Sequence, residues 1–144
     1  MKKLLSIGLA LITVASIHAQ NNLASSSVPA ATKAAFAKAH PNVNGKWEKE
    51  DGNYEVSFKE NGKDMSCIID KNGSIQETET EIPVSELPSP VTGYIAKHYK
   101  GIKVKEAAMI VKADGSIVYE AEIKGEDVLV DAKGNLVNKK KDND

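Results

Sequence analysis

One pattern occurs twice along this chain, and the repetition limits the available folds more than any other feature. Two helical stretches, 28–40 and 87–99, carry apolar residues at helical spacing. Aligned at an offset of 59 positions, 36–38 (Phe-Ala-Lys) falls on 95–97 (Ile-Ala-Lys). Self-similarity at a fixed offset is typical of a repeated supersecondary unit. We therefore expect two copies of one small unit.

After each helix the apolar period changes from 3.6 to 2. Asn61-Gly62, Asn72-Gly73 and Asp114-Gly115 separate the alternating runs, and such dipeptides are strong hairpin signals. The predicted strands are 46–50, 53–59, 63–70 and 74–82 in the first copy, and 103–112, 116–124, 126–131 and 136–138 in the second. The fold class is α+β: tandem duplicated units of one helix plus an antiparallel β-meander. In each unit we expect the helix to cover one strand face and the other face to stay polar.

From these patterns we predict a signal peptide, two helix-meander units and short segments that connect or flank them. The predicted parts are a signal peptide at 1–19, a flexible N-terminal segment at 20–26, a first helix-meander unit at 27–82, a linker at 83–86, a second unit at 87–138 and a charged tail at 139–144.

The N-terminus has the order of a secretory signal peptide. Lys2 and Lys3 precede an apolar run, 4–17, and Ala19 supplies the small residue before cleavage. The run is shorter than the roughly 20 residues that span a bilayer, so a membrane anchor is disfavoured. No Cys follows the run to accept a lipid. The sequence predicts cleavage near Ala19 and a periplasmic or extracellular product without a membrane attachment.

Charge and cysteine content exclude several classes of partner. The chain has no Arg, and removing Lys2 and Lys3 leaves 17 lysines against 20 acidic residues, a net charge of −3. Nucleic acids and anionic membranes select clustered positive charge, so neither is an expected partner. Cys67 is the only cysteine, so no internal disulfide forms. Its apolar surroundings favour a buried thiol over a reactive one.

Three segments resemble a known group of exported proteins. These are 38–41 (Lys-Ala-His-Pro), 46–55 and 77–83, which are similar to the PepSY-like, beta-lactamase-inhibitor-like proteins typical of Bacteroidetes. The resemblance covers about 27–137. It implies a helix-plus-meander fold used twice. It also implies that inhibitors of this type bind an enzyme through the sheet face away from the helices, whereas PepSY domains restrain peptidases.

Catalytic and metal-binding motifs are missing from the sequence. His40 and His98 fall near the two helix ends, where each is expected to cap a C-terminus. No His-x-x-x-His, Cys-x-x-Cys or Gly-x-Ser-x-Gly occurs, and no base is evident for the lone Cys. We therefore expect no enzyme activity and no cofactor.

The preferred hypothesis is a non-enzymatic binding protein that inhibits or modulates another exported protein. Its open sheet face would make the contact. Trp47 is either a surface anchor or, by preference, part of the first core. The other candidate binding residues are Glu55, Ser57, Lys59, Glu120, Glu122 and Lys124.

The alternative hypothesis is a cation or small-ligand binder. Glu77, Glu79 and Glu81 point to one face of a strand, and carboxylates suit a hard cation such as calcium. Their spacing of ~6.5–7 Å is too wide for one ion to bridge, which favours a solvated strand instead. The segment 70–73 (Asp-Lys-Asn-Gly) superficially resembles the start of an EF-hand loop but is interpreted as a hairpin turn.

Overall fold

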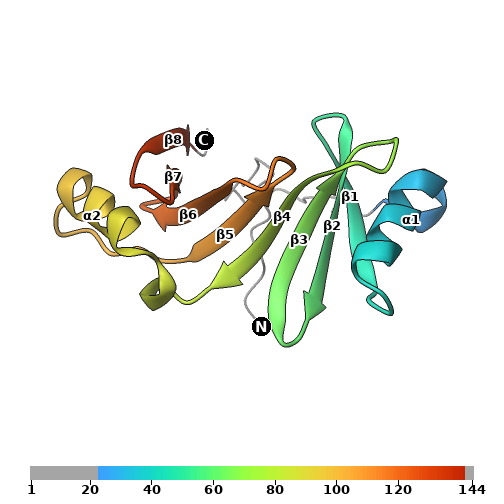
Figure 1. Ribbon diagram of the computed structural model, residues 1–144, viewed down its shortest axis with the longest axis horizontal. Helices are drawn as coiled ribbons and strands as arrows, with labels where there is room; N and C mark the ends of the chain where they lie inside the picture. The colour runs from blue at the N-terminus through green and yellow to red at the C-terminus, as the bar shows by residue number, and fades with distance from the viewer. Residues whose placement is uncertain (1–22, 142–144) are drawn as a thin grey trace, which may run out of the picture. The chain divides into compact units, whose positions relative to one another are not determined.

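The computed structural model describes residues 23–141, which contain two α-helices and eight antiparallel strands (Figure 1). The predicted α+β class is confirmed. Contacts divide the chain into two units, with the boundary between Glu79 and Thr80, and within each unit the strand order follows the sequence. The predicted signal peptide and residues 20–22 lie outside the described residues.

The first unit begins with a 3-10 turn and a short helix. Leu23, within the segment 20–26 that was predicted to be flexible, donates its backbone N–H to the carbonyl of Trp47 at 2.7 Å. The elements are η1 (Ser25–Ser27), α1 (Ala30–Ala39), β1 (Gly45–Glu50), β2 (Asn53–Glu60), β3 (Lys63–Ile69) and β4 (Ile75–Ile82). Alanine favours the helix, and Pro41 prevents its continuation.

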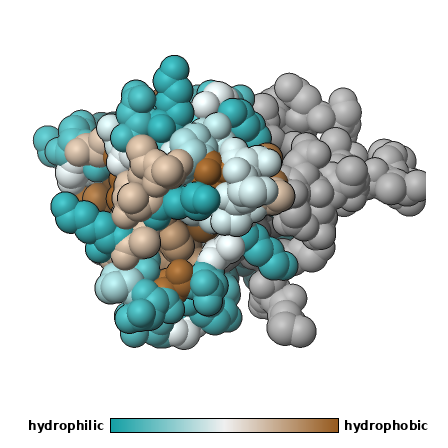
Figure 2. Space-filling model, turned by 90° about the vertical axis from the view of Figure 1, so that its right-hand side faces the viewer, coloured by the Kyte–Doolittle hydropathy of each residue, from teal (hydrophilic) through white to brown (hydrophobic). Residues whose placement is uncertain are grey.

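The first core lies between α1 and one face of these strands. The register pairs Trp47 with Val56 and Val56 with Cys67, so these three side chains share the helix-facing side. The ring of Phe36 from α1 packs edge-on against Trp47 and Phe58, with centroids 5.6 and 5.1 Å away. Figure 2 views the molecule from the α1 side, where hydrophilic side chains surround smaller apolar patches.

The second unit repeats the order with different details. The elements are η2 (Val84–Glu86), α2 (Ser89–His98), β5 (Ala107–Lys112), β6 (Ile117–Ile123), β7 (Glu126–Asp131) and β8 (Leu136–Lys141). Its core gathers Ile82, Leu87, Val91, Ile95, Ala107, Ala121, Ile123, Val128 and Val130.

Two predicted boundaries in this unit are wrong. The strand expected over 103–112 begins only at Ala107, because the chain after α2 first crosses a longer irregular segment. The expected tail at 139–144 is strand as far as Lys141, since the backbone of β8 pairs with β7 up to the Glu126–Lys141 pair. The linker 83–86 contains the 3-10 turn η2, and Ile82 already belongs to the second core.

In each unit the start of the helix packs closely against a hairpin turn of the same kind. A Cβ added at Gly73, in the β3–β4 turn, would lie 2.8 Å from the carbonyl oxygen of Ala31 in α1. One added at Gly134, in the β7–β8 turn, would lie 2.8 Å from the carbonyl oxygen of Pro90 in α2. Both glycines have φ of +89°, so only glycine fits the turn and the close helix approach together.

An aspartate organises each of these turns. Asp70 Oδ1 accepts the backbone N–H groups of Asn72 and Ser74 at 2.8 and 2.9 Å. Asp131 Oδ1 accepts those of Lys133 and Asn135 in the same way. Hydrogen bonds with Ser74 and Asn135 respectively are the main reason that both pKa values lie below the ordinary aspartate value.

Because of these two aspartates, we expect the stability of the fold to decrease at acidic pH. Because the folded-state pKa is depressed, each aspartate stabilises the fold above its unfolded-state pKa and loses that contribution as the pH falls through the folded-state pKa, below about pH 4. We expect Asp70→Asn to lose less stability than the wild type between about pH 7 and about pH 3, measured by urea unfolding. An unchanged pH dependence in Asp70→Asn and in Asp131→Asn would contradict this assignment.

Candidate functional site

The strand face away from α1 carries the first group of candidate binding residues. Glu55, Ser57 and Lys59 alternate with the core residues of β2 and therefore share this face. They differ in accessibility: Glu55 is only 3% exposed, Ser57 is half-buried and Lys59 is exposed. Lys59 Nζ lies 3.2 Å from Asp64 Oδ1 on the neighbouring strand. The expectation of an open face is therefore wrong at Glu55.

The same face of the first unit is strongly acidic. Its lysines are Lys46 and Lys59. Its carboxylates come from all four strands: Glu48, Glu50, Glu55, Asp64, Glu77 and Glu79. The contact between Thr78 Oγ1 and Cys67 Sγ at 3.4 Å places Thr78 on the helix side of β4, which turns Glu77 and Glu79 to the acidic face.

In the second unit the corresponding carboxylates are also buried. Glu120 and Glu122 are 7% and 8% exposed. Lys105 Nζ donates to Glu122 Oε1 at 2.8 Å, and this hydrogen bond raises the pKa of Lys105. Lys124 is exposed in the turn after β6, with φ of +56°.

This second face is also less polar than expected. Ile110, Val118 and Leu129 are all buried, yet they alternate with residues of the helix-side core. The register pairs Ile110 with Val118, and Leu129 with Glu120. The prediction that the face away from the helix stays polar is therefore wrong for the middle of the second unit, where β5, β6 and β7 contribute aliphatic side chains.

Trp47 does not lie on a binding surface. It is 7% exposed and packs against Phe36 and the other aromatic residues of the first core. Trp47 lies in the core, as the preferred interpretation expected. Alternation along β1 turns Trp47 toward α1 and Glu48 away from it.

The acidic strand of the alternative hypothesis is β4. Glu79 is 4% exposed, whereas Glu77 and Glu81 are half-buried, so the strand is not the uniformly solvated one that was expected. Among residues 23–141, no group of three or more His, Cys, Asp or Glu side chains is placed to hold a metal ion.

A polar cluster beside the first core was not foreseen. His40 Nδ1 lies 2.9 Å from Glu60 Oε2, and His40 Nε2 lies 3.6 Å from Cys67 Sγ. The expectation that Cys67 lacks a basic neighbour is therefore wrong. Sequence separations of 20 and 27 residues hide the cluster, and only the position of His40 at the end of α1 hints at it.

The cluster has the order of groups found in Cys-His-acid hydrolases but not their accessibility. Cys67 is fully buried, and desolvation raises the pKa of its thiol. A protonated, inaccessible thiol is a poor nucleophile. His40 follows α1 as its C-cap residue and contacts the Phe36 and Phe58 rings, so the cluster joins the helix end to β2 and β3. His98 instead stacks on Tyr94, with ring centroids 4.3 Å apart.

Comparison with solved structures identifies the fold. A DUF2874 family protein from Bacteroides uniformis superposes with a TM-score of 0.70 at 20% identity, over 78% of this chain and 88% of that one. This chain has the same fold as that protein. A BLIP-like protein from Bacteroides fragilis gives 0.64 at 23% identity, over 78% and 85%. A Bacteroides eggerthii protein described as periplasmic gives 0.71 at 16%, over 78% and 88%.

The fold expected from the resemblance to beta-lactamase-inhibitor-like proteins is therefore confirmed. No protein-family model matches the sequence, and no curated protein matches it either. Within the described part of the chain, neither α-helix is long and apolar enough to cross a membrane.

Proposed function

We propose that this chain is a non-enzymatic exported protein that binds another exported protein and modulates its activity. The contact surface is the strand face of the first unit that points away from α1. Export is supported by the signal-like N-terminus and by a neighbour of the same fold that is described as periplasmic. Binding of another protein is supported by the likeness in fold to a BLIP-like protein.

The acidic face of the first unit is the observation that carries this proposal. Among residues 45–79, six carboxylates and two lysines lie on the side of the strands opposite the aromatic core, and Glu55 and Glu79 among them are buried. Fixed negative charge on a twisted sheet favours a partner with a basic patch, because complementary potentials speed encounter and set register. Glu48 and Glu77, both half-buried, are accessible enough to contribute directly.

A pull-down from the native envelope fraction, followed by mass spectrometry, tests the proposal. We expect the wild type to retain a basic exported protein, with weaker retention at high salt. Glu48→Lys and Glu77→Lys should each lower the affinity for that partner by roughly 3- to 10-fold. Glu86→Lys, the same charge change on the exposed turn η2, is the matched control.

Two results would contradict the proposal. One is the absence of any salt-sensitive partner together with no effect on exported peptidases or lactamases. The other is equal loss of binding in Glu48→Lys and in Glu86→Lys, since the acidic face would then have no specific role.

Cation binding through Glu77, Glu79 and Glu81 is the alternative, and no arrangement of side chains in the described residues favours it. Thermal unfolding with and without calcium separates the two. A rise in melting temperature that disappears on changing these three residues to Gln would support the cation hypothesis.

A further inference from the structure

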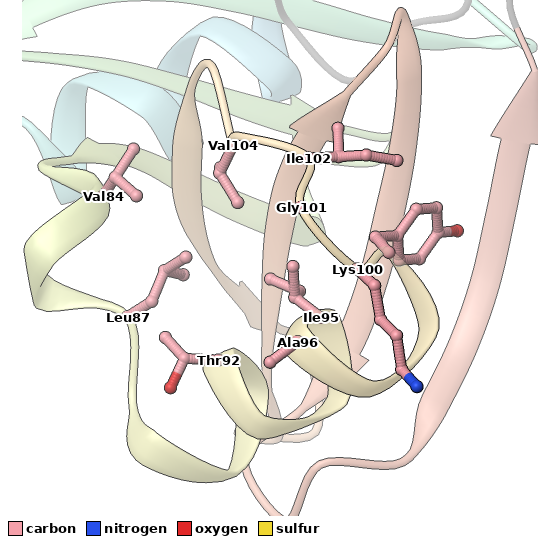
Figure 3. Close-up of a pocket in the computed structure, with 10 residues that line it drawn as sticks. Val84, Leu87, Thr92, Ile95, Ala96, Lys100, Gly101, Ile102 and Val104 are labelled. Carbon is pink, nitrogen blue, oxygen red and sulfur yellow. The ribbon is translucent and has the colours of Figure 1, made fainter.

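The second unit contains an apolar pocket that lies outside the proposed protein-binding face. It is bounded by η2, by α2 and by the irregular segment 99–106 that follows the helix (Figure 3). Its volume of about 520 Å3 is within the usual range for small-molecule sites. Aliphatic side chains form most of the lining: Val84, Leu87, Ile95, Ile102 and Val104.

The first unit has aromatic residues at two core positions where the second unit has aliphatic ones. Trp47 pairs with Val56 and Ala107 pairs with Ala121. Val56 and Ala121 each follow a Tyr-Glu pair, 54–55 or 119–120, so Trp47 and Ala107 are equivalent. At the offset of 59 positions that aligns the two helices, Phe36 matches Ile95, so two aromatic residues of the first core correspond to smaller side chains in the second.

The segment between helix and first strand also differs. It spans 99–106 in the second unit and only 40–44 in the first, which makes it three residues longer. Its Ile102 and Val104 line the pocket and remain half-buried. Smaller core side chains and a longer apolar loop together distinguish this part of the second unit from the first.

The stretch 87–105, which supplies nine of the ten residues that line the pocket, is positively charged. Lys97, Lys100 and Lys103 are exposed, and no acidic residue occurs from Leu87 to Lys105. Lys100 borders the pocket, and in Figure 3 its ammonium lies outside the aliphatic cluster, as expected for a charged group at a rim. Glu86 precedes this stretch, and Lys105 already binds Glu122. An occupant that matches both features is apolar along its length and negative at one end.

We propose that this pocket binds a linear fatty-acid carboxylate. The hydrocarbon chain lies among the aliphatic side chains of η2, α2 and 99–106, where burial removes apolar surface from water. The carboxylate remains at the rim, beside Lys100. This site is independent of the protein-binding face, so either can fail without the other.

Calorimetric titration with dodecanoate, below its critical micelle concentration, tests the proposal. We expect saturable binding that dodecyltrimethylammonium, with the same chain and the opposite charge, does not reproduce. In spectra of 15N-labelled protein, the backbone signals that shift should cluster in 84–104. Lys100→Gln should weaken binding by about 2- to 5-fold, and added salt should lessen this difference.

Ala96→Glu provides the sharper variant. Ala96 is an exposed helix residue that borders the pocket, so a glutamate there adds bulk and negative charge with little risk to folding. We expect at least about tenfold weaker binding, because the carboxylate of the ligand would meet a like charge. Ala37→Glu, at the equivalent exposed position of α1, is the matched control and should bind as the wild type does.

Three results would overturn the proposal. They are no saturable binding of dodecanoate, equal affinity for dodecyltrimethylammonium, and undiminished binding by an Ala96→Glu variant whose circular dichroism is unchanged. Equal affinity for the two amphiphiles would identify a general apolar groove without charge selection.

Discussion

Replacing Phe36 with alanine should lower the free energy of unfolding by about 3–5 kcal/mol. Phe36 is buried at the centre of the first core, and its ring contacts the rings of His40, Trp47 and Phe58. The substitution removes the hydrophobic contribution of the ring and leaves a cavity that the surrounding strands cannot close completely. Urea unfolding followed by far-ultraviolet circular dichroism measures the change.

Lys38→Ala is the control for Phe36→Ala. Lys38 is exposed two residues further along α1, so its removal should change stability by less than about 0.5 kcal/mol. A loss below about 1 kcal/mol in Phe36→Ala would mean that α1 does not pack on the strands as described.

Replacing Gly73 with alanine should destabilise the first unit by about 2–4 kcal/mol, and Gly134→Ala should do the same in the second. Each position combines a φ of +89° with a helix carbonyl oxygen 2.8 Å from the added Cβ. Relief requires the helix to move away from its turn, because the obstructing atom belongs to the backbone. Chemical denaturation of the two variants measures the loss.

Gly115→Ala separates two contributions to the loss of stability: the strain of a positive φ and the steric clash of the added Cβ with the helix. Gly115 has φ of +80° in the β5–β6 turn, and nothing lies within 4 Å of an added Cβ. We expect a loss of only about 1–2 kcal/mol there. Equal losses at Gly73 and Gly115 would show that the helix contact contributes nothing to the requirement for glycine.

The sequence predicted the elements that local patterns determine. Asn61-Gly62 and Asp114-Gly115 lie at the hairpin turns where they were expected, and the alternation of Tyr54, Val56 and Phe58 correctly predicted the core face of β2. A turn depends on a few consecutive residues, and so does the side to which a strand residue points.

Features that depend on distant residues were not predictable in this way. The cluster of His40, Glu60 and Cys67 forms only when α1 packs on β2 and β3. The burial of Glu55 depends on strands at both of its sides, since it lies between Glu48 and Ile68. Alternation gives the direction of such a side chain but not its accessibility.

The pocket of the second unit shows the same limit. The strand predicted over 103–112 included Val104, whereas Ile102 and Val104 both belong to an irregular segment beside α2. An apolar residue before a strand has the same periodic signature whether it enters the sheet or lines a loop. Only the tertiary path of 99–106 distinguishes these cases.

The position of Trp47 provides an optical probe of one half of the molecule. It is the only tryptophan of the chain, and it is buried against the aromatic residues of the first unit. Three of the four tyrosines, Tyr94, Tyr99 and Tyr119, pack instead against the second core. Emission excited at the red edge of the indole band therefore follows the melting of the first unit alone, and comparison with a whole-chain signal reveals whether the two halves unfold in one step.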